Sequence, residues 1–395
     1  MRESGYAVEI KNTQDERVNN VRNRKLKVMS AFGTRPEAIK MCPLVKKLQE
    51  NPDIESIVCL TGQHQQMLDQ VTEVFGVTAD YDLNIMRPKQ TLTTITSDIL
   101  LGIESVLKEV APDVVLVHGD TSTSFAVALA AFYQQIPVGH VEAGLRTFNP
   151  YSPFPEEMNR CLTGRIASIH FAPTVKNKRN LENEGITKNV FITGNTVIDA
   201  FRTTIRENYV FKAPELKGFD PSFGRTILMT AHRRENLGEP LENICRAVRR
   251  LVEDFSDIQV VYPVHLNPAV RQTVNAILGG VDRVHLIEPV DVEDIHNLIN
   301  RSYLVMTDSG GLQEEAPSCG VPVLVLRTET ERPEAVEAGT VKVVGVEEDV
   351  IYQEAVDLLT NPQKYEEMAR VINPYGDGHA SERIVEHLLN TFKGV

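Results

Sequence analysis

Three acidic residues in the first half of the chain have the placement of an acid/base cluster. Asp120 and Glu142 each come at the end of a predicted strand, and Glu156 lies in the first turn of a predicted helix behind two prolines. A single acid at such a place can be a plain helix cap, the alternative for Asp120, or a partner of the helix dipole. Three sets of acids on one edge of a domain, opposite cations, favour an acid/base site whose members have displaced pKa values.

Two cations are predicted at the same edge. Arg35 follows the first strand, in the stretch GTRPE (33–37), and Lys40 lies about one turn into the next helix. Cations beside a helix start suit a phosphate group, and the alternative is a surface ion pair with Glu37. The stretch is not a GxGxxG fingerprint and no such fingerprint follows another strand, which weighs against a nicotinamide dinucleotide.

The second half of the chain has a turn suited to an anion. The stretch DSGG (308–311) follows an apolar strand and leads into a helix that carries Glu314 and Glu315. Small residues let a ligand approach the backbone N–H groups and the positive end of the helix. A diphosphate fits if one carboxylate is turned away to accept hydrogen bonds, for instance from ribose hydroxyls. The alternative is an ordinary turn capped by Ser309.

Two histidines follow the first two strands of this second half. His232 is followed by Arg233 and Arg234, which favours the neutral form of its ring for hydrogen bonding or proton transfer, and His265 follows the next strand. A structural histidine is the alternative reading. The sequence has no recognisable nucleophile arrangement such as GxSxG, and its five scattered cysteines include no CxxC pair and no histidine at metal-ligand spacing. We therefore expect no metal site.

The elements that position these residues alternate between strand and helix, which predicts parallel sheets covered on both faces. The predicted fold class is α/β, with two doubly wound, Rossmann-like domains in series. We place the first at 25–195, joined by a C-terminal helix from 376–395, and the second at 196–375. Ligands of such sheets bind beyond the carboxyl ends of the strands, so we expect a site in the cleft where the domains face each other. The predicted strands are 25–32, 56–60, 114–117, 138–141, 169–172, 190–193, 226–230, 259–262, 284–287, 304–307, 323–326 and 341–344.

The composition excludes several classes of protein. With 42% hydrophobic and 24% charged residues, the 395-residue chain is ordinary for a globular protein, and its longest apolar runs are strand-sized, so no membrane span is predicted. A net charge of -13 opposes nonspecific binding of nucleic acid or anionic lipid. The scattered cysteines read as buried thiols of a cytoplasmic protein. Residues 1–24 are polar and mixed in charge, and we expect them to be a disordered extension.

Taken together, the motifs resemble the non-hydrolysing UDP-N-acetylglucosamine 2-epimerases. The resemblance runs in order along nearly the whole chain from Lys25 and implies a GT-B fold. It also implies a homodimer that interconverts UDP-N-acetylglucosamine and UDP-N-acetylmannosamine without a nicotinamide cofactor or an essential metal. The motifs are GTRPEAIK (33–40), TGQH (61–64), HGDT (118–121), HVEAGLRT (140–147), YSPFPEEMNR (151–160), TGNTVIDA (193–200), AHRREN (231–236), DSGGLQEEAPSCGVPVLVLR (308–327), TERPEAVEAGT (330–340) and NPYGDGHASERI (373–384).

The chemistry that the resemblance implies makes sense of these residue types. No carbonyl adjoins C2 of the sugar, so direct loss of its hydrogen is implausible, whereas anti elimination of UDP gives 2-acetamidoglucal and re-addition inverts C2. Carboxylates near C2 and a strong hold on the leaving diphosphate are then needed. By resemblance, the acid/base residues are Asp120, Glu142 and Glu156, with His232 as a further catalytic residue. The substrate-binding residues are Arg35, Lys40, Ser309, Gly310, Gly311 and Glu315.

The resemblance also implies a second, activating UDP-N-acetylglucosamine site beside the first. The matching residues are Gln63, His64, Gln66, Gln90, Glu156, Arg233 and His265. The chain departs from the family pattern at Lys89, where an arginine is expected, and a lysine cannot reproduce a bidentate guanidinium contact. We predict that substrate activation is retained.

Three other functions compete with this reading. A hydrolysing epimerase would release UDP and free N-acetylmannosamine, and a GT-B glycosyltransferase would need an acceptor groove. A nucleotide-sugar sensor would bind UDP without exchange at C2. Carboxylates directed at an anionic ligand weaken binding unless they do chemistry, which argues against the sensor.

Overall fold

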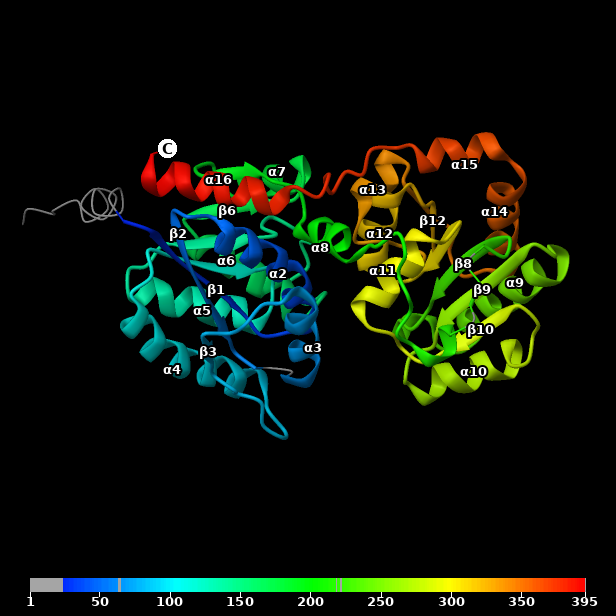
Figure 1. Ribbon diagram of the computed structural model, residues 1–395, viewed down its shortest axis with the longest axis horizontal. Helices are drawn as coiled ribbons and strands as arrows, with labels where there is room; N and C mark the ends of the chain where they lie inside the picture. The colour runs from blue at the N-terminus through cyan, green and yellow to red at the C-terminus, as the bar shows by residue number, and fades with distance from the viewer. Residues whose placement is uncertain (1–23, 63–64, 218, 221, 395) are drawn as a thin grey trace, which may run out of the picture. The chain divides into compact units, whose positions relative to one another are not determined.

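The computed structural model describes residues 24–62, 65–217, 219–220 and 222–394, and divides into two compact units (Figure 1). Unit 1 holds the described residues up to Phe171, with Asn180–Phe191 and the residues from Ser381 onward. Unit 2 holds Ala172–Arg179 and Ile192–Ala380. The predicted boundary between the domains lies after residue 195, whereas in the structure unit 2 begins again at Ile192. The segment Ala172–Arg179 also belongs to unit 2, which the sequence did not predict.

Unit 1 is built on a seven-stranded sheet with the order β3-β2-β1-β4-β5-β6-β7. The first strand is apolar and almost wholly buried, as expected for a strand with helices over both faces. Its neighbours β2 and β4 both run parallel to it. The strands are β1 (Leu26–Phe32), β2 (Ile54–Leu60), β3 (Tyr81–Asp82), β4 (Val114–His118), β5 (Val138–Val141), β6 (Ile169–Ala172) and β7 (Val190–Ile192).

Helices connect these strands, and the last helix of the chain returns to this unit. In that helix His387 stacks on Phe191 with ring centroids 4.0 Å apart, and Lys393 pairs with Asp53 at 2.6 Å. The helices are α2 (Arg35–Glu50), α3 (Gln65–Phe75), α4 (Leu92–Val110), α5 (Ser122–Tyr133), α6 (Glu156–Ile166), α7 (Val175–Asn183), which straddles the unit boundary, and α16 (Ala380–Lys393).

Unit 2 repeats the plan with six strands in the order β10-β9-β8-β11-β12-β13. The strands are β8 (Arg225–Thr230), β9 (Ile258–Pro263), β10 (Val284–Ile287), β11 (Leu304–Thr307), β12 (Val323–Val325) and β13 (Val341–Val343). The α-helices are α8 (Thr196–Thr204), α9 (Glu239–Asp254), α10 (Pro268–Leu278), α11 (Val292–Asn300), α12 (Gly310–Glu315), α13 (Pro333–Ala338), α14 (Glu348–Thr360) and α15 (Pro362–Ala369). The 3-10 turns are η1 (Pro214–Leu216), η2 (Arg234–Asn236) and η3 (Ala316–Cys319).

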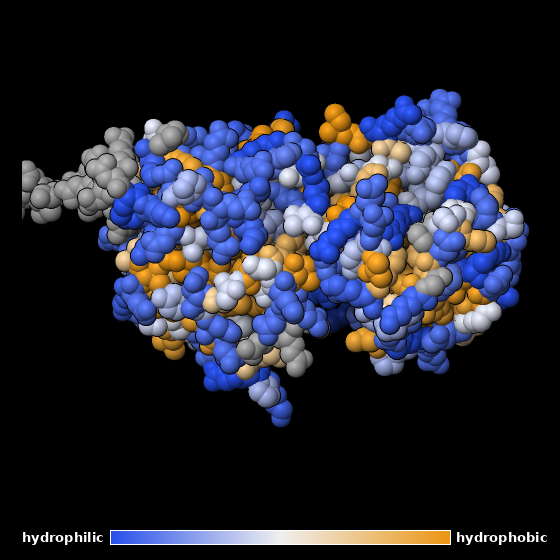
Figure 2. Space-filling view, viewed as in Figure 1, coloured by the Kyte–Doolittle hydropathy of each residue, from blue (hydrophilic) through white to orange (hydrophobic). Residues whose placement is uncertain are grey.

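The core of unit 2 shows why these sequences form these elements. Helix α9 buries positions three or four residues apart, such as Leu241, Ile244, Val248 and Leu251, against the apolar strands of the sheet. At about 25 cal/mol per Å² of apolar surface, each such side chain contributes roughly 1.5–3 kcal/mol. In Figure 2 the visible surface of each unit is mostly hydrophilic, with scattered apolar patches. None of the described helices is both long and apolar enough to span a bilayer.

Each sheet has one switch point, where successive connections leave in opposite directions. It lies between β1 and β4 in unit 1 and between β8 and β11 in unit 2. The loops that follow two such strands diverge and leave a ligand-binding crevice at the carboxyl ends. Most of the residues singled out by the sequence follow these four strands.

Two predictions of local structure were wrong. The sequence pattern indicated a polar, Pro- and Gly-containing region from 196 to about 225, but this region contains α8, which Asn195 caps by accepting a hydrogen bond from the Val197 backbone at 3.1 Å. The pattern also predicted a helix over 313–318, whereas α12 begins at Gly310 and its last turn tightens into η3. The predicted extension 1–24 lies outside the described residues except for Arg24, which pairs with Asp113 at 2.6 Å.

Candidate active site

Glu142 lies at the end of β5 in a strained backbone conformation. Its φ of +62° is in the left-handed region, which costs energy for a side chain larger than glycine and is most often kept at functional sites. The carboxylate is 9% exposed, forms an ion pair with Lys40, and lies 3.5 Å from His118 Nε2. A Cβ at Gly119 would come within 3.7 Å of its Oε1, so the carboxylate is beside the turn that precedes Asp120.

The charge state of Glu142 follows from these neighbours. Burial by itself would raise the pKa of the Glu142 carboxyl, because it penalises the charged form. The Lys40 ammonium and the His118 ring outweigh that effect and hold the pKa well below its usual range. Lys40, predicted as a phosphate ligand or a surface partner of Glu37, is therefore the counterion of a buried carboxylate in this structure.

Asp120 follows β4 and forms an ion pair with Arg160 of α6. Asn159 of the same helix donates to the Asp120 backbone carbonyl at 3.0 Å, so residues of α6 bind both the side chain and the backbone of Asp120. The alternative reading of Asp120 as a plain cap is wrong, because Thr121 caps α5 by accepting from the Ser124 backbone at 3.0 Å. The Asp120 side chain is 24% exposed and can reach a ligand.

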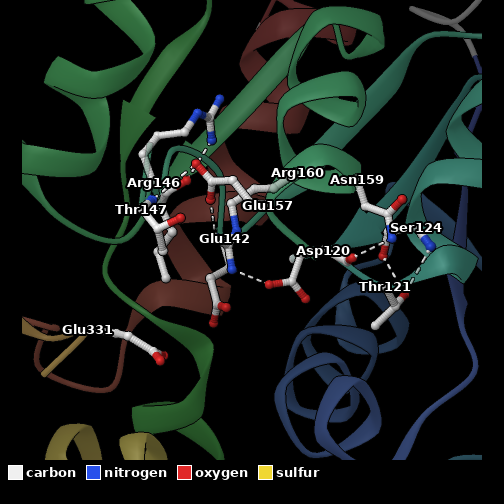
Figure 3. A network of polar contacts seen from close by, with 12 residues as sticks. Asp120, Thr121, Ser124, Glu142, Arg146, Thr147, Glu157, Asn159, Arg160 and Glu331 are labelled. Atoms are coloured by element: carbon white, nitrogen blue, oxygen red, sulfur yellow. Dashed lines mark hydrogen bonds and ion pairs between the residues drawn. The ribbon is translucent and has the colours of Figure 1, made fainter. Parts of the chain in front are cut away.

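The two glutamates that begin α6 have different surroundings. Glu156, the predicted acid/base residue, is half-buried and makes no side-chain hydrogen bond or ion pair with the residues that the structure describes. Glu157 is 2% exposed and accepts from the backbones of Thr147 at 3.0 Å and Phe148 at 2.9 Å. Figure 3 shows Arg160 between Glu157 and Asp120, with Glu157 Oε2 3.1 Å from Arg160 Nη1.

Sequence reasoning missed Glu157 and Arg160. Their spacing of three residues puts them on one face of a helix, which was a visible signal for an ion pair. Nothing in the sequence indicated that Arg160 also pairs with Asp120, because 40 residues separate the two.

A buried carboxylate closes the turn that carries Arg35. Glu37 accepts from the backbones of Gly33 at 3.0 Å and Thr34 at 2.8 Å, and from the Thr121 hydroxyl at 2.6 Å. Gly33 is needed here, since a Cβ would come within 1.9 Å of Thr61 Oγ1. The Arg35 side chain makes no hydrogen bond or ion pair within the described ranges, so the predicted pairing with Glu37 is wrong for it.

In unit 2, His232 follows β8 and is held by Asp308 at the end of β11. Asp308 is fully buried, and its Oδ2 accepts from the His232 and Arg233 backbones, each at 2.7 Å. Its Oδ1 lies 3.3 Å from His232 Nδ1. The His265 ring stacks on His232 with centroids 5.3 Å apart, so the structure brings these two predicted residues together.

The pKa of His232 is lowered, as predicted, but chiefly for another reason. Burial is the main cause, with smaller contributions from His265 and Arg233, while Asp308 opposes them. The expectation rested on the arginines alone, because the partial enclosure of the ring, whose side chain is 38% exposed, is not visible in a sequence.

In the DSGG turn the Ser309 backbone is engaged, since its N–H donates to Thr307 Oγ1 at 2.9 Å and its carbonyl accepts from Gln313 at 3.1 Å. Ser309 occupies the cap position of α12 without a capping hydrogen bond from its side chain, so the alternative of an ordinary capped turn is wrong. The two carboxylates behind it are distinct. Glu314 is 1% exposed, accepts a hydrogen bond from Asn195 at 3.0 Å and forms an ion pair with Arg332. Arg332 therefore balances the charge of Glu314, which would otherwise repel an anion at the turn. Glu315 is 8% exposed and lies 3.6 Å from His296 Nε2.

The predicted activating-site residues are only partly described. Gln63 and His64 lie outside the described residues, as does the side chain of Gln66. Gln90 closes its own loop by donating to the Ile85 carbonyl at 2.7 Å, and Lys89 has a positive φ of +61°. Arg233 Nη1 is 4.0 Å from Glu331.

Within the described ranges, no group of three His, Cys, Asp or Glu side chains could hold a metal ion.

Comparisons with known proteins identify the family of the chain. The model of the UDP-N-acetylglucosamine 2-epimerase family matches residues 46–389. The UDP-N-acetylglucosamine 2-epimerase of Bacillus subtilis is 59% identical over 367 residues, which covers 93% of this chain and 96% of that protein. Among solved structures, the UDP-GlcNAc 2-epimerase of Neisseria meningitidis bound to UDP-GlcNAc is 51% identical with a TM-score of 0.84, covering 92% of this chain and 100% of the other.

A more distant solved structure extends the comparison. The Methanocaldococcus jannaschii UDP-GlcNAc 2-epimerase in complex with UDP-GlcNAc and UDP is 35% identical, with a TM-score of 0.73, and covers 92% of this chain and 99% of the other. These matches confirm the predicted α/β class with two Rossmann-like domains. The chain belongs to the UDP-N-acetylglucosamine 2-epimerase family, whose members are isomerases.

Proposed function

We propose that the protein interconverts UDP-N-acetylglucosamine and UDP-N-acetylmannosamine without hydrolysis. A base takes the C2 proton, the C1–O bond to UDP breaks with its electron pair leaving on the diphosphate, and a C1=C2 double bond forms. A proton then returns to the other face of C2, and the diphosphate oxygen attacks C1. Atoms and electrons balance without an oxidant or a second substrate.

The observation that carries this proposal is the carboxylate arrangement at the switch point of unit 1. Glu142 is held as an anion by Lys40, and Asp120 is oriented by Arg160 beside it. Glu156 is the half-buried acid of this group without a counterion among the described residues. Elimination and re-addition need a proton acceptor and a proton donor at C2, and three carboxylates in different surroundings supply both.

The proposed diphosphate ligands are cations and small residues. Arg35 supports this role because its guanidinium is not engaged by described residues, and Ser309 because its hydroxyl is not used for capping. Gly310 and Gly311 allow close approach to the backbone. Glu315 would accept hydrogen bonds from ribose hydroxyls, and His232 would act near the leaving group, where a neutral ring can accept a proton.

Assembly and regulation are further parts of the proposal. Homodimerisation is supported by the exposed apolar side chains Leu101, Phe132 and Tyr133 on α4 and α5, which are 72%, 58% and 69% exposed. We also propose that activation by a second UDP-N-acetylglucosamine is retained, with Lys89 in place of the expected arginine, because the nearby Arg87 pairs with Asp98. A cytoplasmic location is proposed from the five scattered, unpaired cysteines.

Proton NMR in deuterated water tests the function. The protein and UDP-N-acetylglucosamine should give a mixture with intact UDP-N-acetylmannosamine and deuterium at C2. Stoichiometric UDP and free N-acetylmannosamine would assign the hydrolysing reaction instead, and UDP binding without exchange would assign a sensor or a transferase.

Variants link the exchange to the site. Glu142→Gln and Asp120→Asn should each slow exchange by about 10²–10⁴-fold, the usual contribution of a positioned acid or base. Glu104→Gln is the matched control, because Glu104 is an exposed carboxylate paired with Lys108 on the surface of α4. Equal rates for the site variants and the control would refute the proposed roles.

A further inference from the structure

We infer that Asp308 is a positioning residue that keeps the proton of the neutral His232 ring on Nδ1. The other ring nitrogen, Nε2, is then left as a lone-pair acceptor for a substrate proton or hydrogen bond. The importance of this for turnover rests on the catalytic role proposed for His232, whereas the proton position itself does not.

The carboxylate of Asp308 is fixed by donors on one side. Its Oδ2 accepts from the His232 backbone at 2.7 Å, the Arg233 backbone at 2.7 Å and the Asn236 side chain at 3.0 Å. Asn236 is itself held, since it also donates to the Leu326 carbonyl at 3.0 Å. Asp308 is fully buried at the end of β11, so this carboxylate has one orientation.

The other oxygen faces the histidine ring. Asp308 Oδ1 is buried, accepts no hydrogen bond from the described part of the chain, and lies 3.3 Å from His232 Nδ1. An ionised carboxylate can only accept, so the ring nitrogen that faces it carries a proton in the favourable arrangement. The His232 side chain is 38% exposed, but Asp308 Oδ1 is buried, so a lone pair at Nδ1 would leave that oxygen next to a second acceptor and without a donor, which is costly.

Burial of the ring favours a neutral imidazole, and the Asp308 carboxylate favours the tautomer with its proton on Nδ1. The groups that face His232 are Asp308 from β11, His265 after β9 and Arg233 from its own loop. Burial lowers the pKa of His232 and Asp308 opposes that change. Removing the negative charge should therefore lower the pKa of His232 further, which separates an electrostatic role from a purely structural one.

The variant Asp308→Asn isolates the tautomer from the loop structure. An amide can still serve the three donors only if its carbonyl oxygen takes the place of Oδ2. Its NH₂ group then faces His232 Nδ1 and donates to it, which moves the ring proton to Nε2. The loop is retained and the acceptor at Nε2 is lost.

The experiment is long-range ¹H–¹⁵N NMR of protein labelled on its ten histidines, at pH 8, with His232→Gln to identify the signal. We expect a protonated Nδ1 and an unprotonated Nε2 for His232 in the wild type, and the reverse in Asp308→Asn. The wild-type spectrum alone overturns the inference if Nε2 carries the proton, so a poorly folded variant does not obscure the outcome.

Kinetics provide the second readout. Asp308→Asn should lower kcat by about 10²-fold or more with a change of only a few-fold in KM. The double variant Asp308→Asn/His232→Gln should be no slower than His232→Gln, because both changes remove the same acceptor. Additive losses would overturn the inference. If the tautomer reverses while His232→Gln keeps full activity, the inference holds and the catalytic role proposed for His232 fails.

Discussion

Replacing Lys40 by methionine tests whether Glu142 is a buried anion that depends on one counterion. Methionine keeps the length and helix propensity of the side chain in α2 but removes its charge. The two partners are 15% and 9% exposed, so solvent screens the pair little. Breaking a buried ion pair by removing one partner typically costs about 3–5 kcal/mol, and we expect a loss of that size in the free energy of unfolding at pH 7.5.

The loss should depend on pH in a defined direction. In the wild type the pKa of Glu142 lies well below its usual value, so pairing stabilises the fold above about pH 4.3 and is lost as the pH falls toward the folded pKa. Without Lys40, burial is opposed by His118 alone and the folded pKa should rise above the unfolded value. The penalty should then be largest at pH 7.5 and shrink toward pH 5, where Glu142 takes up a proton.

Urea unfolding followed by circular dichroism at pH 7.5 and pH 5 measures this. The proteins compared are the wild type, Lys40→Met, Glu142→Gln and the double variant Lys40→Met/Glu142→Gln. In the double variant neither charge of the pair is left without its partner. The double variant should recover part of the loss, since a buried anion without a partner costs more than a neutral pair. A loss in Lys40→Met below about 1 kcal/mol, or one equal at both pH values and additive in the double variant, would refute the reasoning.

Three further predictions concern other buried groups. Arg160→Met should lower kcat by about 10²-fold with little change in KM, because Asp120 loses the partner that orients it; an unchanged kcat in steady-state assays would contradict this. His140 is buried with its pKa lowered by burial to about 3, so protonation in the unfolded chain destabilises the fold as the pH falls from about 6.5 toward 3. The wild type should therefore lose about 2–3 kcal/mol more than His140→Gln between pH 7 and pH 4.5 in urea unfolding, and equal losses would exclude this cause. Arg332→Met should cost about 3–5 kcal/mol at pH 7 by leaving Glu314 unpaired, with partial recovery in Arg332→Met/Glu314→Gln, and a smaller loss in the single than in the double variant would count against it.

The succession of strands and helices along the chain and the class of the fold were predictable because burial on both faces leaves a strong pattern. The apolar run 304–307 and the helical spacing at 268–278 and 292–300 predict β11, α10 and α11 with the observed bounds. Helix α8 was missed although Val197, Ile198 and Phe201 have helical spacing and are buried, because Asn195 and the glycine before it were read as loop signals. The strand β3 has two residues, too few for any pattern.

The candidate site was predictable in its residue types but not in its pairings. Lys40 was expected at an anion because it is a cation near a strand end, and the anion beside it is Glu142, which lies 102 residues away in the chain. Of two adjacent glutamates that both satisfy a helix dipole, only tertiary packing determines that Glu157 is buried and Glu156 is not. Patterns identify which residues can do chemistry, whereas counterions are determined by which loops the topology brings together.

Both units use the same device at the switch point, a buried carboxylate that joins the two diverging loops. Glu37, 1% exposed, accepts from the turn after β1 and from the Thr121 hydroxyl after β4. Asp308 begins the loop after β11 and accepts from the backbone after β8. Glu37 accepts hydrogen bonds on both of its oxygens, whereas Asp308 accepts three on Oδ2 and places Oδ1 beside His232 Nδ1. Arg35 and His232 each lie on a turn whose backbone is already fixed, so a group that bound at either turn would not bear the entropic cost of ordering it.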